Sequence, residues 1–426
     1  MLIEFRVENF FSIQDEQVLS MTTNNDNTFL NSHTNSDKKL TLLKSSVIYG
    51  ANAAGKSNII KALGIMKEIV ISSATWQRGK KLPVTPFLLG QEDDKPTKFE
   101  IIFMQDNTRY QYGFILTSEK ILEEWLLVFG ESNRAQKWFE RIYNEKEGRY
   151  DYSFGAKFLG SKQLWAENTR DNALYLSVAT QLNSEQLKSI FDFFLNHLKI
   201  TCLDKWNDGK KVTINILKQD KQKIIDYLKF VDLDIEDIEI EEKELDTDIL
   251  MHPMFPKEIK QAIQVDLEKG AKLTQTDIHT IHTNQQGEKI TFDMDTAESK
   301  GTLKFFNLIG PWVDALKRGY TIVIDELNTH MHPLMTKFLV ELFHNKTLNK
   351  NNAQLIFTTH DTSILNQKVF RRDQIWFCEK QNKATKLYPL SDFKVRKDKT
   401  NLENDYLLGR FGALPYFQDI SLLMGI

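Results

Sequence analysis

A run of residues near the N-terminus has the types and spacing of a phosphate-binding loop. It comprises Gly50, Ala51, Asn52, Ala53, Ala54, Gly55, Lys56 and Ser57. The run fits the pattern G-x-x-x-x-G-K-[ST], in which backbone N–H groups wrap a β-phosphate and glycines permit the close approach. The pattern predicts an ATP site in which Lys56 reaches the β- and γ-phosphates and Ser57 binds Mg²⁺.

The sequence on either side of the loop predicts the elements that would position it. An apolar run at 42–49 precedes the loop and indicates a buried strand, and apolar residues at helical spacing follow from 58 to 70. The helix would direct the positive end of its dipole at the bound phosphates. A chance glycine-rich turn is the alternative, and the strand–loop–helix context disfavours it.

A pair of acids follows a second apolar strand. Thr321 to Ile324 are apolar or β-branched, and Asp325 and Glu326 come next. Carboxylates at the C-terminal end of a parallel strand lie at the ligand-binding edge of the sheet. There Asp325 suits the Mg²⁺ shell, and Glu326 suits a general base that polarises the attacking water. The alternative is an ordinary strand end whose acids lead into a helix.

Three further residues complete the predicted chemistry. A third strand, at 355–359, ends at His360, where an imidazole can contact the γ-phosphate, although a histidine at a strand end is more often structural. Ser299 and Gly301 stand at the start of an amphipathic helix expected at 302–316. A helix start of this kind can bind a γ-phosphate, whereas the structural alternative makes Ser299 an N-cap.

Composition predicts a soluble cytoplasmic protein. The chain has 426 residues, 41% of them hydrophobic, and a net charge of −3. Cys202 and Cys378 lie far apart without metal-binding neighbours, which fits a reducing compartment. No apolar run approaches the length that a bilayer crossing needs, so we expect no membrane partner.

The element pattern predicts an α/β fold with an inserted middle. We expect residues 1–75 and 290–426 to form one ATPase head built from both ends of the chain. Residues 76–180 indicate a β-rich lobe, with an antiparallel meander between 83 and 158. Residues 181–289 indicate a mainly helical insertion and a candidate partner-binding region, with helices near 184–198, 218–230 and 257–269. The acidic stretch 232–248 within it is interpreted as a solvated loop or an edge strand.

With these residues in order, the chain resembles the ABC-type P-loop ATPases of the SMC, RecF and overcoming-lysogenization-defect group. The opening run 5–12 is similar to that group's first strand, which implies that Asn9 lies beside the nucleotide. Residues 298–302 take the place of the L-S-G-G-Q signature, but only Ser299 and Gly301 match it. His360 matches the switch histidine. The resemblance implies a homodimer, or a higher oligomer, that sandwiches ATP and Mg²⁺ between its heads.

A closer resemblance is to stand-alone AAA-family ATPases of bacterial anti-phage defence loci, the AbiL- and RloA-like proteins. It implies an anti-phage role together with a companion effector, a nuclease or toxin encoded alongside. The matching runs are 298–302, 325–333, 353–360, 372–375 and 406–415.

Three functions remain open at this point. The first is an ATP-hydrolysing switch or sensor that controls a separate effector. The second is a DNA-repair or DNA-clamping ATPase of the RecF/SMC type, and the third is an ATP-stabilised scaffold that sequesters a toxin or nuclease. Glu326 favours turnover over pure scaffolding. Basic stretches at 210–211, 218–223, 371–372 and 394–399 would suit DNA, but acids lie among or near most of them.

Overall fold

The computed structural model describes residues 1–37, 40–90, 95–130, 134–202, 207–244, 267, 274–395 and 401–415. The chain divides into two compact units. The first comprises Met1–Lys205, Asp314–Thr329 and Thr336–Ile426, and the second comprises Trp206–Val313 and His330–Met335. The helix predicted at 257–269 lies outside the described residues, apart from Leu267.

A six-stranded sheet forms the base of the first unit and confirms the predicted α/β class. Its order is β11 (Leu198–Cys202), β15 (Thr321–Asp325), β16 (Gln354–Thr358), β5 (Ser45–Gly50), β17 (Ile375–Gln381) and β18 (Ala384–Pro389). The first five strands are parallel, and β18 is antiparallel to β17. Every residue of β5 and β16 is buried, as expected for parallel strands that are covered on both faces.

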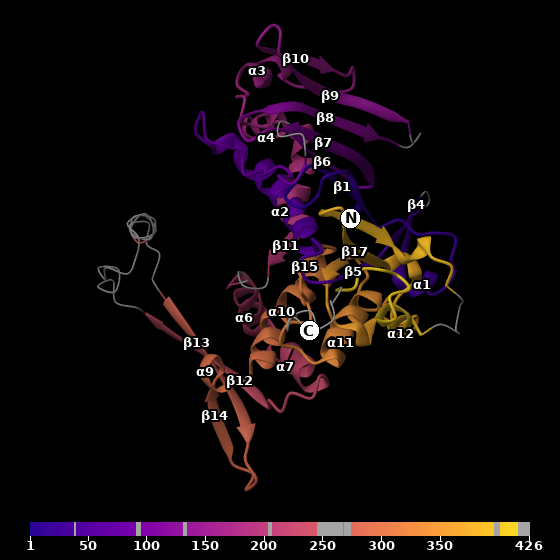
Figure 1. The fold of residues 1–426 in the computed structure, drawn as a ribbon. Helices are drawn as coiled ribbons and strands as arrows, with labels where there is room; N and C mark the ends of the chain where they lie inside the picture. The colour runs from indigo at the N-terminus through magenta and orange to yellow at the C-terminus, as the bar shows by residue number, and fades with distance from the viewer. Residues whose placement is uncertain are drawn as a thin grey trace, which may run out of the picture. The chain divides into compact units, whose positions relative to one another are not determined.

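A seven-stranded antiparallel sheet forms the other layer of the first unit (Figure 1). Its order is β10 (Arg149–Phe154), β9 (Ala135–Asn144), β8 (Ile121–Phe129), β7 (Thr108–Leu116), β6 (Thr97–Gln105), β1 (Leu2–Glu8) and β2 (Gln17–Ser20). The predicted meander is confirmed. The sheet also extends beyond the meander, because β1 pairs with β6, so hydrogen bonds join regions 1–75 and 76–180 across the predicted boundary.

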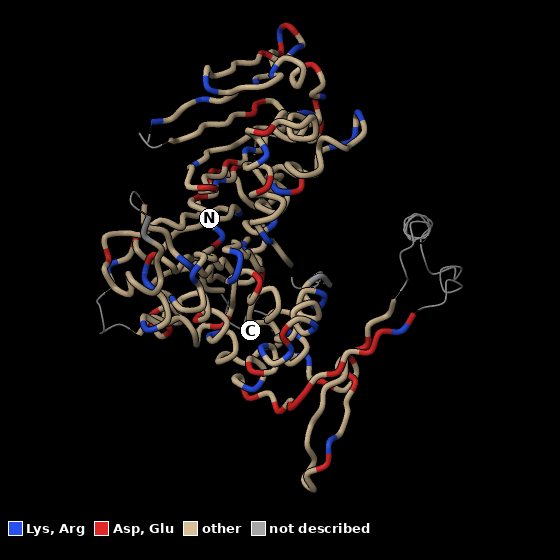
Figure 2. The backbone as a smooth tube through the Cα atoms, turned by 180° about the vertical axis from the view of Figure 1, so that it is seen from behind, with Lys and Arg blue, Asp and Glu red and all other residues tan. Residues whose placement is uncertain are grey.

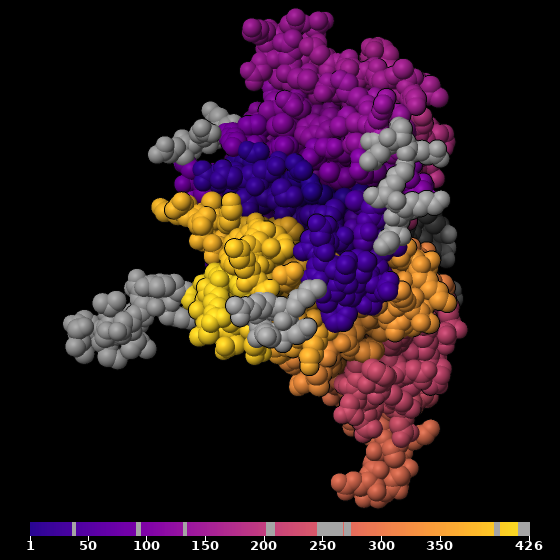
Figure 3. Space-filling view, turned by 90° about the vertical axis from the view of Figure 1, so that its right-hand side faces the viewer, coloured from indigo at the N-terminus to yellow at the C-terminus, as the bar shows by residue number. Residues whose placement is uncertain are grey.

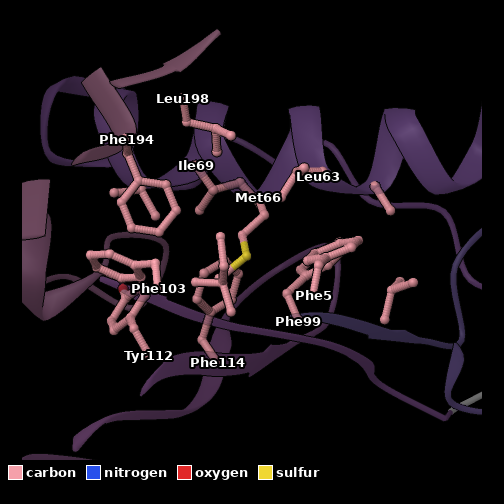
Figure 4. Packing of buried hydrophobic residues seen from close by; sticks show 14 of the residues in the cluster. Phe5, Leu63, Met66, Ile69, Phe99, Phe103, Tyr112, Phe114, Phe194 and Leu198 are labelled. Carbon is pink, nitrogen blue, oxygen red and sulfur yellow. The ribbon is translucent and has the colours of Figure 1, made fainter. Parts of the chain in front are cut away.

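Helix α2 (Lys56–Ser72) lies between the two sheets and begins at the phosphate loop. Figure 4 shows Leu63, Met66 and Ile69 on the face of α2 that meets Phe5 and Phe99 of the antiparallel sheet. Buried residues of β15 and β16 belong to the same hydrophobic cluster. Both layers therefore fix the helix whose N-terminus would face a phosphate.

The first unit also contains short helices and one small hairpin. The hairpin consists of β3 (Thr34–Asp37) and β4 (Leu40–Leu43). The helices are α1 (Leu30–His33), α3 (Lys162–Glu167), α4 (Tyr175–Gln181), α5 (Glu185–Asp192), most of α11 (Pro333–His344), and α12 (Leu402–Leu407). A π-helical turn at Phe193–His197 extends α5, which matches the helix expected near 184–198. This stretch was predicted to belong to the insertion, but it packs within the first unit.

The two ends of the chain meet beside the phosphate loop. The backbone N–H of Thr385 donates to the carbonyl of Ser12 (2.7 Å), and that of Leu387 donates to Oε1 of Gln17 (2.8 Å). Figure 3 shows the N-terminal segment in indigo next to the C-terminal segment in yellow. The loop is thus enclosed by residues that are more than three hundred positions apart in the sequence.

A buried ion pair attaches α4 to the meander. The side chains of Glu124 and Arg141 are both 0% exposed, with 3.8 Å between Oε2 and the guanidinium. The Glu124 carboxylate also accepts the backbone N–H groups of Tyr175 (2.6 Å) and Leu176 (3.0 Å) and the hydroxyl of Tyr112 (3.0 Å). Burial raises the pKa of Glu124 against the opposing effect of Arg141 and these donors.

Two buried histidines stack on each other where α1 and α11 end. The rings of His33 and His344 are 3.7 Å apart between centroids. His33 Nε2 donates to the carbonyl of Val369 (3.0 Å), and His344 Nε2 is 2.7 Å from the hydroxyl of Ser45. Burial lowers the pKa of His33 to about 4 and lowers that of His344 well below its ordinary value. The positive charge of nearby Lys44 adds to both shifts.

These histidines should make the first unit less stable in mild acid. The unfolded chain takes up protons below a pH of about 6.5, whereas the native state excludes them until far lower pH. As the pH is lowered from ~6.5 to ~4, the free energy of unfolding should therefore decrease by about 1.4 kcal/mol per pH unit for each histidine. Urea unfolding at pH 7.5 and pH 5 measures this slope. His33→Phe, which keeps an aromatic ring in the stack, should make the slope shallower, and an unchanged slope would contradict the assignment.

The second unit combines helices with a three-stranded antiparallel sheet. The helices are α6 (Asn207–Gln219), α7 (Lys221–Phe230), α9 (Met294–Ala297) and the first part of α10 (Lys300–Arg318). The strands are β12 (Asp237–Glu244), β13 (Thr274–Thr283) and β14 (Lys289–Asp293), with β13 in the centre. The prediction of a mainly helical insertion missed this sheet. The acidic stretch forms edge strand β12, along which Figure 2 shows successive acids, so its interpretation as an edge strand is confirmed as far as Glu244.

The predicted helix at 218–230 is divided in two. Asp220 separates α6 from α7, and its carboxylate accepts the backbone N–H of Lys223 as the N-cap of α7. Within the described parts of the chain, no helix combines the length and apolarity that a membrane crossing needs.

Candidate functional site

The phosphate loop leaves no room for a side chain at its two glycines. A Cβ added to Gly50 would lie 2.1 Å from the carbonyl oxygen of Cys378, and one added to Gly55 would lie 2.0 Å from Oγ1 of Thr385. Gly55 has φ 108° and Ala53 has φ 61°, so the chain turns through left-handed conformations before α2 begins. Left-handed residues of this kind allow successive backbone N–H groups to point toward one anion, as the sequence pattern predicts.

Lys56 is the first residue of α2 and lies folded over the loop. Its side chain is buried, and Nζ donates to the carbonyl oxygens of Gly50 (2.8 Å) and Ala51 (3.0 Å). Burial lowers the pKa of Lys56, although the negative charges of Glu326 and Asp325 oppose the shift. The next residue, Ser57, is exposed. The cation therefore lies within the loop that would surround a phosphate, in the field of Asp325 at the end of β15 and of Glu326 after it.

The ends of β15 and β16 bring the predicted acids together with His360. Thr358 is the connecting residue, because its hydroxyl donates to Oδ1 of Asp325 (2.5 Å) and accepts the backbone N–H of Glu326 (2.7 Å). Glu326 has a left-handed backbone, with φ 52°. Oε1 of Glu326 lies 3.7 Å from Nε2 of His360. Sequence reasoning missed Thr358, although the Thr358-Thr359-His360 run at a strand end was a usable signal.

The electrostatics of His360 connect it to the same group of residues. Burial lowers the pKa of His360, and the charge of Lys56 lowers it further, while Glu326 and Asp325 raise it. The net effect is a lowered pKa, which favours the neutral imidazole near neutral pH. A neutral ring can accept or donate a hydrogen bond at the edge of the sheet.

The hydroxyl groups of Thr385 and Ser12 form a hydrogen-bonded cluster next to the phosphate loop. The sequence did not reveal this cluster. Oγ1 of Thr385 donates to the carbonyl of Ala54 (2.9 Å) and lies 2.7 Å from Oγ of Ser12. Asn58 Nδ2 donates to the same Ser12 oxygen (2.6 Å). Thr385 lies on β18 and Ser12 on the N-terminal turn, so no local pattern could have paired them with Gly55.

Asn9 has a structural environment in this protein. The residue is 3% exposed, its Oδ1 accepts the backbone N–H of Phe87 (2.9 Å), and its Nδ2 donates to the carbonyls of Lys95 and Pro96. With φ 50°, it forms the turn after β1. The amide is already bonded within the fold, so a role of Asn9 in nucleotide binding stays a prediction that this geometry does not favour.

Ser299 and Gly301 belong to the second unit and begin helix α10. Oγ of Ser299 accepts the backbone N–H of Thr302 (3.1 Å), which is the contact of an N-cap. A Cβ on Gly301 would lie 2.9 Å from the carbonyl of His330, so the glycine permits a close approach there. The structural alternative for Ser299 is therefore realised, and anion binding by the same helix start stays a prediction.

Comparisons with known proteins place the chain in a family. The family described as "AAA domain, putative AbiEii toxin, Type IV TA system" matches residues 45–366, which is most of the chain. Among solved structures, an SMC head domain from Thermotoga maritima is 11% identical, with a TM-score of 0.39 over 92% of this chain and 99% of that chain. The recombination mediator protein RecF, in a structure titled RecF-ATPrS in RecFOR pathway, is 13% identical, with a TM-score of 0.32 over 91% of this chain and 98% of that chain. No curated protein matches.

Both structural similarities are distant, so the assignment relies on the family match and on the site itself. The phosphate loop, Asp325, Glu326 and His360 lie at the C-terminal ends of neighbouring parallel strands, which is the ligand edge of an α/β sheet. The match at 45–366 includes all of these residues. The chain therefore belongs to this AAA-domain family, and it carries the residues of a P-loop nucleotide site at the ligand edge of its parallel sheet.

Proposed function

We propose that the protein is an ATP-hydrolysing switch whose nucleotide state controls a separate effector in bacterial anti-phage defence. The observation that carries the hydrolytic part is the position of Glu326 beside both Asp325 and His360 at the edge that carries Lys56. The family description, which names a toxin–antitoxin system, supports the link to an effector.

The residues present fit ATP and Mg²⁺. The loop has glycines at positions 50 and 55, where no side chain fits, and Ser57 and Asp325 supply the oxygen ligands that Mg²⁺ prefers. Mg²⁺ would offset the negative charge on the β- and γ-phosphates. Lys56 would exchange the carbonyls of Gly50 and Ala51 for phosphate oxygens, and Glu326 would accept a proton from the attacking water.

The proposal includes a composite site formed by two heads. If Ser299 and Gly301 bind a γ-phosphate, they do so on a partner protomer across a two-fold axis. ATP then stabilises the closed homodimer through its higher affinity for that state. Nucleotide hydrolysis would release the pair of heads and thereby change what an effector can bind.

The charges of the described residues favour a switch over a DNA clamp. Several of the basic residues considered for DNA are already ion-paired with acids of this chain. The pairs are Lys210–Asp295 (2.7 Å), Lys218–Glu242, Lys221–Asp237 (2.6 Å), Arg371–Asp373 (2.6 Å) and Arg372–Asp26 (3.3 Å). DNA binding through these residues would require breaking such pairs.

Nucleotide binding and the composite site can be tested with two variants. Lys56→Ala should nearly abolish ATP affinity in calorimetry, because it removes the charge that faces the β- and γ-phosphates. Ser299→Arg should bind ATP but not turn it over. Mixing the two proteins should restore activity, because a mixed dimer has one intact site.

Two results would contradict this scheme. Wild-type affinity in Lys56→Ala would remove the assignment of the phosphate loop. Absence of recovered activity in mixtures that are shown to contain mixed dimers would rule out a shared site.

The control of an effector is tested separately, by co-purifying the chain with the products of neighbouring genes in ATP and in ADP. A partner that is retained equally in both, or no partner at all, would contradict nucleotide control.

A further inference from the structure

A glutamate directly before the α10 helix start is held by the central strand of the second unit. Oε1 of Glu298 accepts the hydroxyl of Thr280 (2.5 Å) and lies 2.7 Å from Nε2 of His282. The Glu298 side chain is 10% exposed, and Thr280 is completely buried. Thr280 and His282 are two residues apart on β13, so they project from the same face of the sheet.

The position of this carboxylate matters because Glu298 precedes the N-cap Ser299. The N-terminus of α10 carries a partial positive charge and free backbone N–H groups. A carboxylate one residue away can turn toward these groups, where it would compete with any other anion and repel a phosphate. Thr280 and His282 bind the carboxylate at β13 instead.

We infer that Thr280 and His282 are positioning residues that hold the Glu298 carboxylate on β13 and so keep the helix start at Ser299 and Gly301 open to a γ-phosphate. The inference rests on the proposed function, in which these two residues serve the site of a partner head. It assigns the β12–β14 sheet a task in the ATPase cycle that the sequence motifs alone do not contain.

The packing of β14 against β13 can affect the contact between His282 and Glu298. The ring of His282 lies 4.9 Å from that of Phe292 on β14, and Thr280 pairs with Phe292 in the strand register. Phe292 is 40% exposed and Ile290, beside His282 in the register, is 39% exposed. Figure 1 shows β13 and β14 as one hairpin next to α9. Any change that shifts β14 would reach Glu298 through His282.

The test combines substitutions of Thr280 and His282 with a substitution that removes the charge of Glu298. His282→Phe keeps an aromatic ring beside Phe292, and Thr280→Val keeps the shape of the threonine, but together they remove both hydrogen bonds to Glu298. We expect this pair to lower kcat for ATP about tenfold, because a charge at a helix end has an effect of this order. The Kd for ATP, which depends on Lys56 and its loop, should not change.

Adding Glu298→Gln to the pair should restore most of the turnover, because the competing charge is gone. His282→Gln alone, which retains an N–H donor, should keep near-wild-type activity. His279→Ala is the matched control: it lies on the same strand but on the opposite face, where its ring is 3.5 Å from Glu241. It should have no effect.

The outcomes separate this inference from the function on which it rests. Wild-type turnover in the His282→Phe, Thr280→Val protein would overturn the inference alone. Lost turnover that Glu298→Gln does not restore would also overturn it, since the two residues would then only support the fold. A wild-type protein that binds ATP without hydrolysing it would overturn the hydrolytic function and this inference together.

Discussion

Glu326→Gln is expected to lower the rate of ATP hydrolysis by ~10²–10⁴-fold while leaving ATP binding intact. The amide has nearly the shape of the carboxylate but cannot accept a proton from water. The backbone of Glu326 is held by its N–H bond to Thr358 (2.7 Å), so the substitution should not move the strand end. Single-turnover hydrolysis, measured beside ATP calorimetry, separates chemistry from binding.

The matched control for this variant is Glu341→Gln. Glu341 lies on α11, pairs with Lys337 at 3.6 Å, and is exposed. It should hydrolyse ATP at the wild-type rate. If Glu326→Gln also turned over at that rate, another group would have to activate the water, and Glu326 would lose its assigned role. If the variant instead lost ATP affinity, the residue would belong to the binding site and not to the chemical step.

Glu124→Ala is expected to destabilise the first unit by about 3–5 kcal/mol, because it leaves the buried charge of Arg141 without its partner. The substitution also removes the acceptor for the backbone N–H groups of Tyr175 and Leu176 at the start of α4. Glu124→Gln should cost less, since the amide oxygen still accepts one of these bonds. Chemical unfolding at pH 7.5 measures both changes.

Glu123→Ala serves as the control for the buried pair. Glu123 is the preceding residue on β8 and is only partly buried, so its loss should change the free energy of unfolding by less than about 0.5 kcal/mol. A small effect of Glu124→Ala would mean that Arg141 finds water or another acceptor when its partner is removed. The pair would then not be what attaches α4 to the meander.

The sequence by itself determined the phosphate loop and the strands around it. The glycines, Lys56 and Ser57 form a contiguous run, and the path of the loop depends on local steric limits at Gly50, Ala53 and Gly55. The apolar runs that end at Asp325 and His360 likewise predicted parallel strands, because burial on both faces gives an uninterrupted hydrophobic pattern. Such features depend on neighbours within a few residues.

Other features depend on contacts that no local pattern contains. The pairing of β1 with β6 joins the N-terminal strand to the meander, and Thr385 reaches Ala54 from the opposite end of the chain. The acidic stretch fits either a solvated loop or an edge strand, and only its pairing with β13 makes it the strand β12. Ile238 on this strand is 2% exposed.

The tertiary structure also decided the surroundings of individual site residues. Asn9 carries the residue type that the resemblance implies, yet its amide is bonded to Phe87, Lys95 and Pro96. The sequence places Glu298 in the signature-like run, and only the fold brings Thr280 and His282 of β13 to its carboxylate. Sequence spacing determines which side chains are available along one element. Long-range packing determines which of their polar groups are already bonded and which remain open to a ligand.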